Sequence, residues 1–260
     1  MTFAWEGFSL EHPEDWTPIT LSGTRREGYA RIASSGRISI QIRWKLSASD
    51  TDLSEKLAGY LTKLSRDSKK KGPMQSKVEE TENGLDYTYS GASSGRGSIF
   101  YDRRTARVFF LEVTSTKDDR LAGLFKETVN SFETGKERWA LMGLDMILPG
   151  IATVEKKAFL AGKTELRLTA RRAAIDAQRW GFGEQLVAKH GLEGWSRSAM
   201  QMPNAAAVVT DMGVALIEDG GLMRPPTFAL VKREPEANRL VTVKVASRDA
   251  KWRPDWTWLA

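Results

Sequence analysis

The sequence contains no cysteine and only two histidines, His12 and His190. Without cysteine there can be no disulfide, thiol nucleophile or thiolate metal site, and two histidines cannot build a multi-histidine metal centre. No GxSxG motif accompanies the histidines, so nothing indicates the nucleophile elbow of serine hydrolases. We therefore assign no catalytic residue, no metal and no cofactor, and favour a protein that is not an enzyme.

Long apolar runs are also missing. The longest, such as residues 205–209 and 214–217, are far shorter than the ~20 residues that a membrane-spanning helix needs. The N-terminal residues, MTFAWE, lack the basic start and apolar core of a signal peptide. We expect no membrane insertion and a cytoplasmic location.

The composition is that of an ordinary globular protein. The chain has 260 residues, of which 41% are hydrophobic and 28% are charged, and this length suits one large domain or two of ordinary size. Thirty-nine basic and thirty-three acidic residues give a net charge of +6. Spread over the whole chain, this is a weak preference for acidic partners or nucleic acid.

An internal repeat is the most informative feature of the sequence. The stretch GFSLEHPEDW begins at Gly7 and GLDMILPGIA begins at Gly143, which is 136 residues later. The same separation relates Trp44, which ends IRW, to Trp180, which ends QRW. It relates Pro13 to Pro149 as well.

Two later landmarks occur in the same order. LAGY at residues 57–60 faces LEGW at 192–195 at a separation of 135, and RVFFLEVTS at 107–115 faces RLVTVKVAS at 239–247 at 132. Four landmarks in order predict a tandem duplication, with a first unit at residues 1–135 and a second, diverged copy at 136–260. The two copies would form a pseudo-dimer within one chain, while the oligomeric state stays open.

Each unit is predicted to be an antiparallel sheet packed against helices, an α+β design. In the first unit, residues 37–44 alternate as a strand with Ile38, Ile40, Ile42 and Trp44 inward. The apolar spacing of residues 53–64 and 121–132 predicts two helices, and further strands are expected at 85–89, 98–102 and 107–114. The second unit has an expected helix at 182–199, but only residues 251–258 stand where the first unit has its closing helix.

This pattern resembles the PsbP-like family. The resemblance rests on the apolar strand that leads to Pro13-x-x-Trp16, on the strand–helix–strand order, and on LFKETVNSFE at residues 124–133. It is weaker in the second half, where LPGIA lacks the tryptophan. The family includes a photosystem subunit, a nuclear-import factor that binds a small GTPase, and bacterial chaperones for secreted effectors. The resemblance implies a binding, adaptor or chaperone-like protein whose partner is another protein, and no individual residue is carried over from it.

The glycine-rich stretch GASSGRGS at residues 91–98 is not a phosphate-binding P-loop. It lacks the lysine of that motif, and a strand rather than a helix is expected after it. We interpret it as a hairpin loop.

Nucleic acid is the alternative partner, because several arginines occur in pairs and Arg43 matches Arg179 across the repeat. A tryptophan cluster at the C-terminus is either packed on the second sheet or an exposed anchor for a partner. The candidate partner-binding residues are Arg43, Arg103, Arg104, Arg171, Arg172, Arg179, Trp252 and Trp256.

The second unit offers a further alternative, a small-ligand site or an enzyme pocket. At a separation of 136, Ile40 and Ile42 correspond to Asp176 and Gln178, which would put polar groups inside a core. A buried polar group without a partner costs ~1–3 kcal/mol, so a pocket at Asp176 and Gln178 would explain them. The favoured alternative is a bulge that shifts the strand by one residue and turns Ile175 and Ala177 inward.

Overall fold

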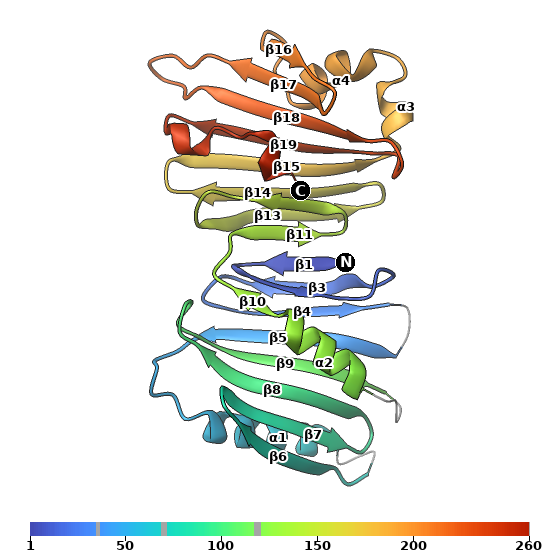
Figure 1. The fold of residues 1–260 in the computed structure, drawn as a ribbon, viewed down its shortest axis with the longest axis vertical. Coiled ribbons are helices and arrows are strands. Elements are labelled where there is room, and N and C mark those ends of the chain that lie inside the picture. The colour runs from blue at the N-terminus through green and yellow to red at the C-terminus, as the bar shows by residue number, and fades with distance from the viewer. Residues whose placement is uncertain (35–36, 69–71, 117–120, 260) are drawn as a thin grey trace. The chain divides into compact units, whose positions relative to one another are not determined.

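The computed structural model describes residues 1–34, 37–68, 72–116 and 121–259. The chain divides into two compact units, Met1–Lys136 and Glu137–Ala260. Both are built from antiparallel sheets with a few helices, as the sequence predicts (Figure 1). Within the described residues, no helix is long and apolar enough to cross a membrane.

Unit 1 contains a seven-stranded antiparallel sheet in the order β3-β4-β5-β9-β8-β7-β6. Its strands are β3 (Thr17–Gly23), β4 (Glu27–Ala33), β5 (Ile38–Leu46), β6 (Gln75–Thr81), β7 (Gly84–Ser90), β8 (Ser94–Asp102) and β9 (Arg107–Ser115). The remaining elements are β1 (Thr2–Trp5), β2 (Phe8–Glu11), α1 (Leu53–Ser68), α2 (Ala122–Ser131) and the short β10 (Glu133–Thr134).

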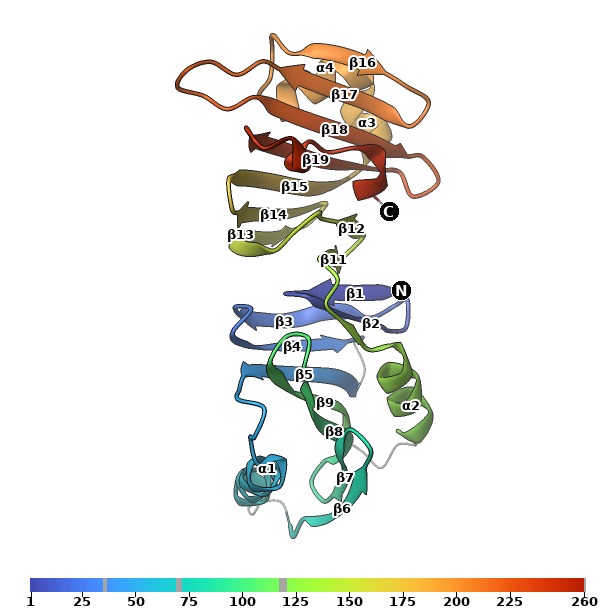
Figure 2. The same cartoon turned by 60° about the vertical axis from the view of Figure 1, so that its left-hand side comes forward.

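The two helices of unit 1 lie on opposite faces of its sheet (Figure 2). On one face, the β1–β2 hairpin and α2 cover an aromatic core, in which the Phe8 ring lies 5.1 Å from Trp44 and 5.6 Å from Phe109. On the other face, Leu57 and Leu61 of α1 belong to a buried cluster with β7, β8 and β9. The predicted alternation of β5 is correct, since Ile40, Ile42 and Trp44 are buried in the first face.

Unit 2 repeats this strand order as β13-β14-β15-β19-β18-β17-β16. Its elements are β11 (Arg138–Leu141), β12 (Leu144–Ile147), β13 (Ala152–Leu160), β14 (Lys163–Ala170), β15 (Ala173–Gly181), α3 (Gly183–Val187), α4 (Gly191–Ala199), β16 (Ala206–Val209), β17 (Gly213–Glu218), β18 (Thr227–Glu234) and β19 (Arg239–Ser247). Two short 3₁₀ turns, Ala250–Trp252 and Trp256–Trp258, stand where unit 1 has α2. The single helix expected at 182–199 is two helices, because Gly191 at the break has a φ of 66°.

The repeated Gly of the opening motif belongs to a tight hairpin turn. Glu6 and Gly7 connect β1 to β2 with φ values of 49° and 81°, and Met142 and Gly143 connect β11 to β12 with values of 50° and 79°. Two positive φ angles define a type I′ turn, which strongly favours glycine. The recurrence of Gly therefore reflects the same hairpin built twice.

The β15 strand is shifted by one residue from the predicted match. Ile32 pairs with Ile40 in unit 1, eight residues later, whereas Leu168 pairs with Ile175 in unit 2, seven residues later. The hairpin before β15 is thus one residue shorter, and Ile40 corresponds to Ile175. The prediction that Ile175 and Ala177 point inward is confirmed, because both are buried. The predicted cause is wrong: the β14–β15 register contains no bulge, and the shorter hairpin produces the shift.

The same shift corrects the match between Arg43 and Arg179. Trp44 pairs with Phe109, the third residue of β9, and Arg179 pairs with Val241, the third residue of β19. The counterpart of Arg179 in unit 1 is therefore Trp44 and not Arg43. Arg43 and Arg179 therefore lie on opposite faces of their sheets, because neighbouring residues of a strand point to opposite sides.

The hairpin loop expected at 91–98 is confirmed only for residues 91–93, which connect β7 to β8, because β8 already begins at Ser94. Gly95 and Gly97 lie inside this strand, opposite Tyr89 and Tyr87. A Cβ atom would stand 2.4 Å from the Tyr89 ring at Gly95 and 2.5 Å from the Tyr87 ring at Gly97. The glycines are there because tyrosine side chains cross the strand.

Candidate functional site

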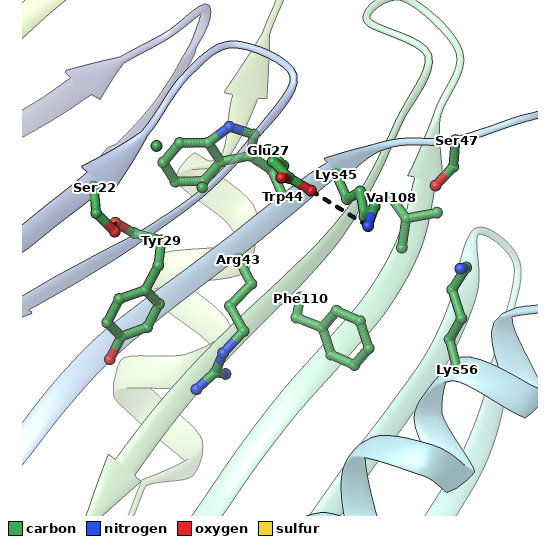
Figure 3. Close-up of a pocket in the computed structure, with 12 residues that line it drawn as sticks. Ser22, Glu27, Tyr29, Arg43, Trp44, Lys45, Ser47, Lys56, Val108 and Phe110 are labelled. Atoms are coloured by element: carbon green, nitrogen blue, oxygen red, sulfur yellow. Dashed lines mark hydrogen bonds and ion pairs between the residues drawn. The ribbon is translucent and has the colours of Figure 1, made fainter.

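A pocket of about 590 Å³ lies on the α1 side of the unit 1 sheet, and we call it the Arg43 pocket (Figure 3). It is formed by the β3–β4 turn, by β4, β5 and β9, and by the start of α1. The residues that line it are Ser22, Gly23, Glu27, Gly28, Tyr29, Arg43, Trp44, Lys45, Ser47, Lys56, Val108 and Phe110.

The strand register makes the pocket wall continuous. Tyr29 pairs with Arg43, and Arg43 pairs with Phe110, so the three side chains stand side by side across β4, β5 and β9. Figure 3 shows Arg43 between the other two. In the next row, Lys45 pairs with Glu27 and their side chains form an ion pair of 3.3 Å at the exposed rim.

The Arg43 guanidinium is held in place by aromatic rings and hydrogen bonds. Its central carbon lies 5.0 Å from the centre of the Tyr29 ring and 5.1 Å from that of the Tyr60 ring, both within cation–π range. Its Nη1 donates to the Tyr60 hydroxyl at 3.3 Å and its Nη2 to the Gln41 Oε1 at 3.1 Å. Burial alone would lower the pKa of Arg43, but the neighbouring Tyr60 and Glu112 outweigh it and raise that pKa. The side chain is a fixed cation.

Glu112 is a buried carboxyl group behind this arginine. It accepts hydrogen bonds from Tyr87 at 2.7 Å, from Tyr60 at 2.9 Å and from Tyr89 at 3.3 Å. Burial raises the pKa of Glu112, while the tyrosine hydrogen bonds and Arg43 act in the opposite direction. Burial and the nearby Glu112 raise the pKa of all three tyrosines, so their hydroxyls stay protonated donors.

The glycines of β8 make this cluster possible. Gly97 pairs with both Glu112 and Tyr87, and because it has no side chain, the Tyr87 ring can cross the strand to reach the carboxyl group. Glu112 and its tyrosines are not among the residues predicted from the sequence. The available signal is a single carboxyl residue within RVFFLEVTS, an otherwise apolar strand, together with alternating Tyr87 and Tyr89 beside SGRGS.

The other predicted arginines are scattered, and none of them lines the Arg43 pocket. Arg103 and Arg104 are exposed in the β8–β9 turn, and Arg171 and Arg172 are exposed in the β14–β15 turn. Arg179 is half-buried, and burial together with the nearby Arg239 lowers its pKa.

The C-terminal tryptophans differ from each other. Of the two alternatives for Trp252, the structure supports packing over an exposed anchor, because only 4% of this residue is accessible and its ring lies 6.3 Å from Trp258. Large apolar side chains of this kind pack in cores. Trp256 is only partly covered.

Asp176 and Gln178 both line a second cavity, of about 330 Å³, in unit 2. They lie on the sheet face that carries α4, where Trp180 packs edge-on against Trp195 at 5.5 Å. The Asp176 carboxylate accepts from Arg167 at 2.7 Å and is partly exposed. The two residues are therefore outside the apolar core, and they face a polar cavity.

No protein-family model matches the chain, and no curated protein matches it. Among solved structures, the chain is similar to the solution structure of cyanobacterial PsbP (CyanoP) from Synechocystis sp. PCC 6803. That similarity has a TM-score of 0.39 and 12% sequence identity, and covers 52% of this chain and 92% of the other. It is distant and concerns the fold alone.

Proposed function

We propose that this protein is a non-enzymatic binding protein that takes up an acidic side chain and its apolar neighbours from a partner protein in the Arg43 pocket. The observation that carries the proposal is the guanidinium of Arg43, fixed between the rings of Tyr29 and Tyr60 at the pocket wall. A guanidinium that is already oriented can bind a carboxylate with two parallel hydrogen bonds and loses little freedom in doing so.

The distribution of residue types supports a protein partner. The rings of Tyr29 and Phe110 flank the arginine on its own face of the sheet, while the rim residues Lys45 and Glu27 keep 70% and 65% of their side chains exposed. Protein interfaces have this arrangement of an aromatic and arginine-rich centre inside a polar rim, and Trp, Tyr and Arg contribute most often to binding energy.

The charges of the pocket support an acidic ligand. Glu27 is paired with Lys45, which leaves the charges of Arg43 and Lys56 in excess among the lining residues. Arg43 donates hydrogen bonds to the Tyr60 hydroxyl and the Gln41 amide oxygen, and neither partner is a carboxylate that a ligand would have to displace. Complementary charge of this kind favours the correct partner and the rate of encounter.

The experiment is selection of a displayed library of random 12-residue peptides against the whole protein. We expect enrichment of peptides in which Asp or Glu stands beside Phe, Leu, Ile or Trp. A selected peptide is then synthesised and its affinity measured by fluorescence anisotropy. Arg43→Gln should weaken binding at least tenfold, and Arg43→Lys should weaken it less, because the charge is kept but the planar donor pair is lost.

Arg37→Gln is the matched control, because this arginine is exposed near the opposite end of β5. It should bind like the wild type, and circular dichroism establishes that each variant is folded. Selection without acidic residues, or equal affinity for the Arg43→Gln protein, contradicts the proposal.

A further inference from the structure

The cavity of unit 2 occupies the place that the Glu112 cluster occupies in unit 1, but its charge is reversed. Glu112 pairs with Gln41 in β5, and Lys244 pairs with Asp176 in β15, at the same positions of the two ladders. A cation in β19 has thus replaced the buried acid of β9.

The tyrosines that satisfy Glu112 have no counterparts around Lys244. Tyr87 reaches Glu112 across Gly97, whereas Leu216 stands across Ala229 from Lys244. Within the described chain, the hydrogen bond of Lys244 goes to the main-chain oxygen of Met200, at 2.6 Å, at the end of α4. A carbonyl at a helix C-terminus suits a cation, yet it occupies only one of three ammonium donors and is not itself an anion.

The carboxylates that line the cavity are engaged by other cations. Asp176 accepts from Arg167 at 2.7 Å, and Glu165 accepts from Lys163 at 3.0 Å and from Lys156 at 3.3 Å. Lys244 is therefore the lining cation that has no salt bridge in the described part of the chain.

We propose that the cavity beside Lys244 binds a small organic anion that also carries hydroxyl groups. Lys244 binds the anionic group, and the hydroxyl groups donate to the carboxylates of Asp176 and Glu165, which keep free lone pairs. The volume of about 330 Å³ lies at the lower end of the ~300–1,000 Å³ typical of ligand pockets, so the ligand is small. The Trp180 side chain supplies an apolar wall.

The test is isothermal titration calorimetry of the whole protein with L-malate and, separately, with glycerol 3-phosphate. These probes distinguish a carboxylate from a phosphate ligand, and glycerol is the uncharged control. We expect one of the two anions to bind and glycerol not to bind. Lys244→Gln should weaken binding at least tenfold, while Lys189→Gln, at an exposed lysine of the same unit, should leave it unchanged.

Asp176→Asn should change the affinity for the anion in the opposite direction to Lys244→Gln. It therefore tests the proposal even if the Lys244→Gln protein does not fold. Removal of a negative charge beside Lys244 should tighten anion binding several-fold, although one hydroxyl acceptor is weakened. Failure of both anions to bind, equal binding by the Lys244→Gln protein, or loss of binding in the Asp176→Asn protein overturns the proposal.

Discussion

The Tyr87–Glu112 hydrogen bond gives a direct measure of the buried cluster behind Arg43. Tyr87→Phe removes only the hydroxyl that donates to Glu112 at 2.7 Å, and both residues are buried. The ring remains, so no cavity forms. A hydrogen bond to a neutral group contributes ~1 kcal/mol and one to a charged group ~1.5–3 kcal/mol, so we expect unit 1 to lose between 1 and about 3 kcal/mol.

The size of this loss also reports the charge of Glu112. A loss near ~1 kcal/mol at neutral pH indicates a protonated carboxyl group, and one of ~2–3 kcal/mol indicates a carboxylate. The assay is hydrogen exchange of peptides from β8 and β9 in increasing urea, because these peptides follow unit 1 separately from unit 2.

Tyr101→Phe is the control, since this tyrosine is only partly buried and its hydroxyl has no hydrogen bond among the described residues. It should change the free energy of unfolding by less than ~0.5 kcal/mol. If Tyr87→Phe costs no more than this control, the cluster does not stabilise the fold and the reasoning is wrong.

Three further predictions follow from the geometry. The pKa of Glu112 is raised in the folded state. Its contribution to stability is therefore complete at pH values below the unfolded pKa and is lost as the pH rises through the folded pKa. Urea titrations at increasing pH should show the wild type losing stability relative to Glu112→Gln between these two pKa values. Gly97→Ala should destabilise unit 1 in the same denaturation assay, because its Cβ atom would stand 2.5 Å from the Tyr87 ring. Gly59→Ala in α1 is the control in the opposite direction: a Cβ atom there meets open space, so the substitution should stabilise the helix by ~1 kcal/mol. Trp252→Ala should cost ~3–5 kcal/mol in thermal unfolding if this side chain is packed as a core residue, and a neutral effect would restore the exposed-anchor hypothesis.

The fold could be predicted from the sequence because its signals are local. The strand alternation of β5, the apolar spacing of α1 and the repeated hairpin at Gly7 and Gly143 each lie within a few residues. The length of one hairpin could not be predicted, and this single residue moved Trp180 to the other face of its sheet. Since the side-chain period of a strand is two, an error of one residue exchanges every inward and outward position.

Most of the candidate site could not be predicted from the sequence, because its residues come from different strands and helices. Arg43, Tyr60, Tyr87 and Glu112 lie on β5, α1, β7 and β9. They meet only through the order β5-β9-β8-β7, which hydrophobic periodicity does not determine. The match with Arg179 that points to Arg43 in the sequence is wrong, because the two arginines lie on opposite faces of their sheets.

The two proposed sites carry their charges on opposite strands of the corresponding strand pair, so a single substitution in one unit should affect the site of that unit alone. The cation of unit 1 is Arg43 on β5 and the acid is Glu112 on β9; in unit 2 the acid is Asp176 on β15 and the cation is Lys244 on β19. Each pair lies within its own unit, so Arg43→Gln should leave malate or glycerol phosphate binding unchanged, and Lys244→Gln should leave peptide affinity unchanged. Calorimetry and anisotropy on both variants test this. Loss of both activities in either variant would mean that the units act as one site, and that the duplication preserved a shared function rather than allowing two.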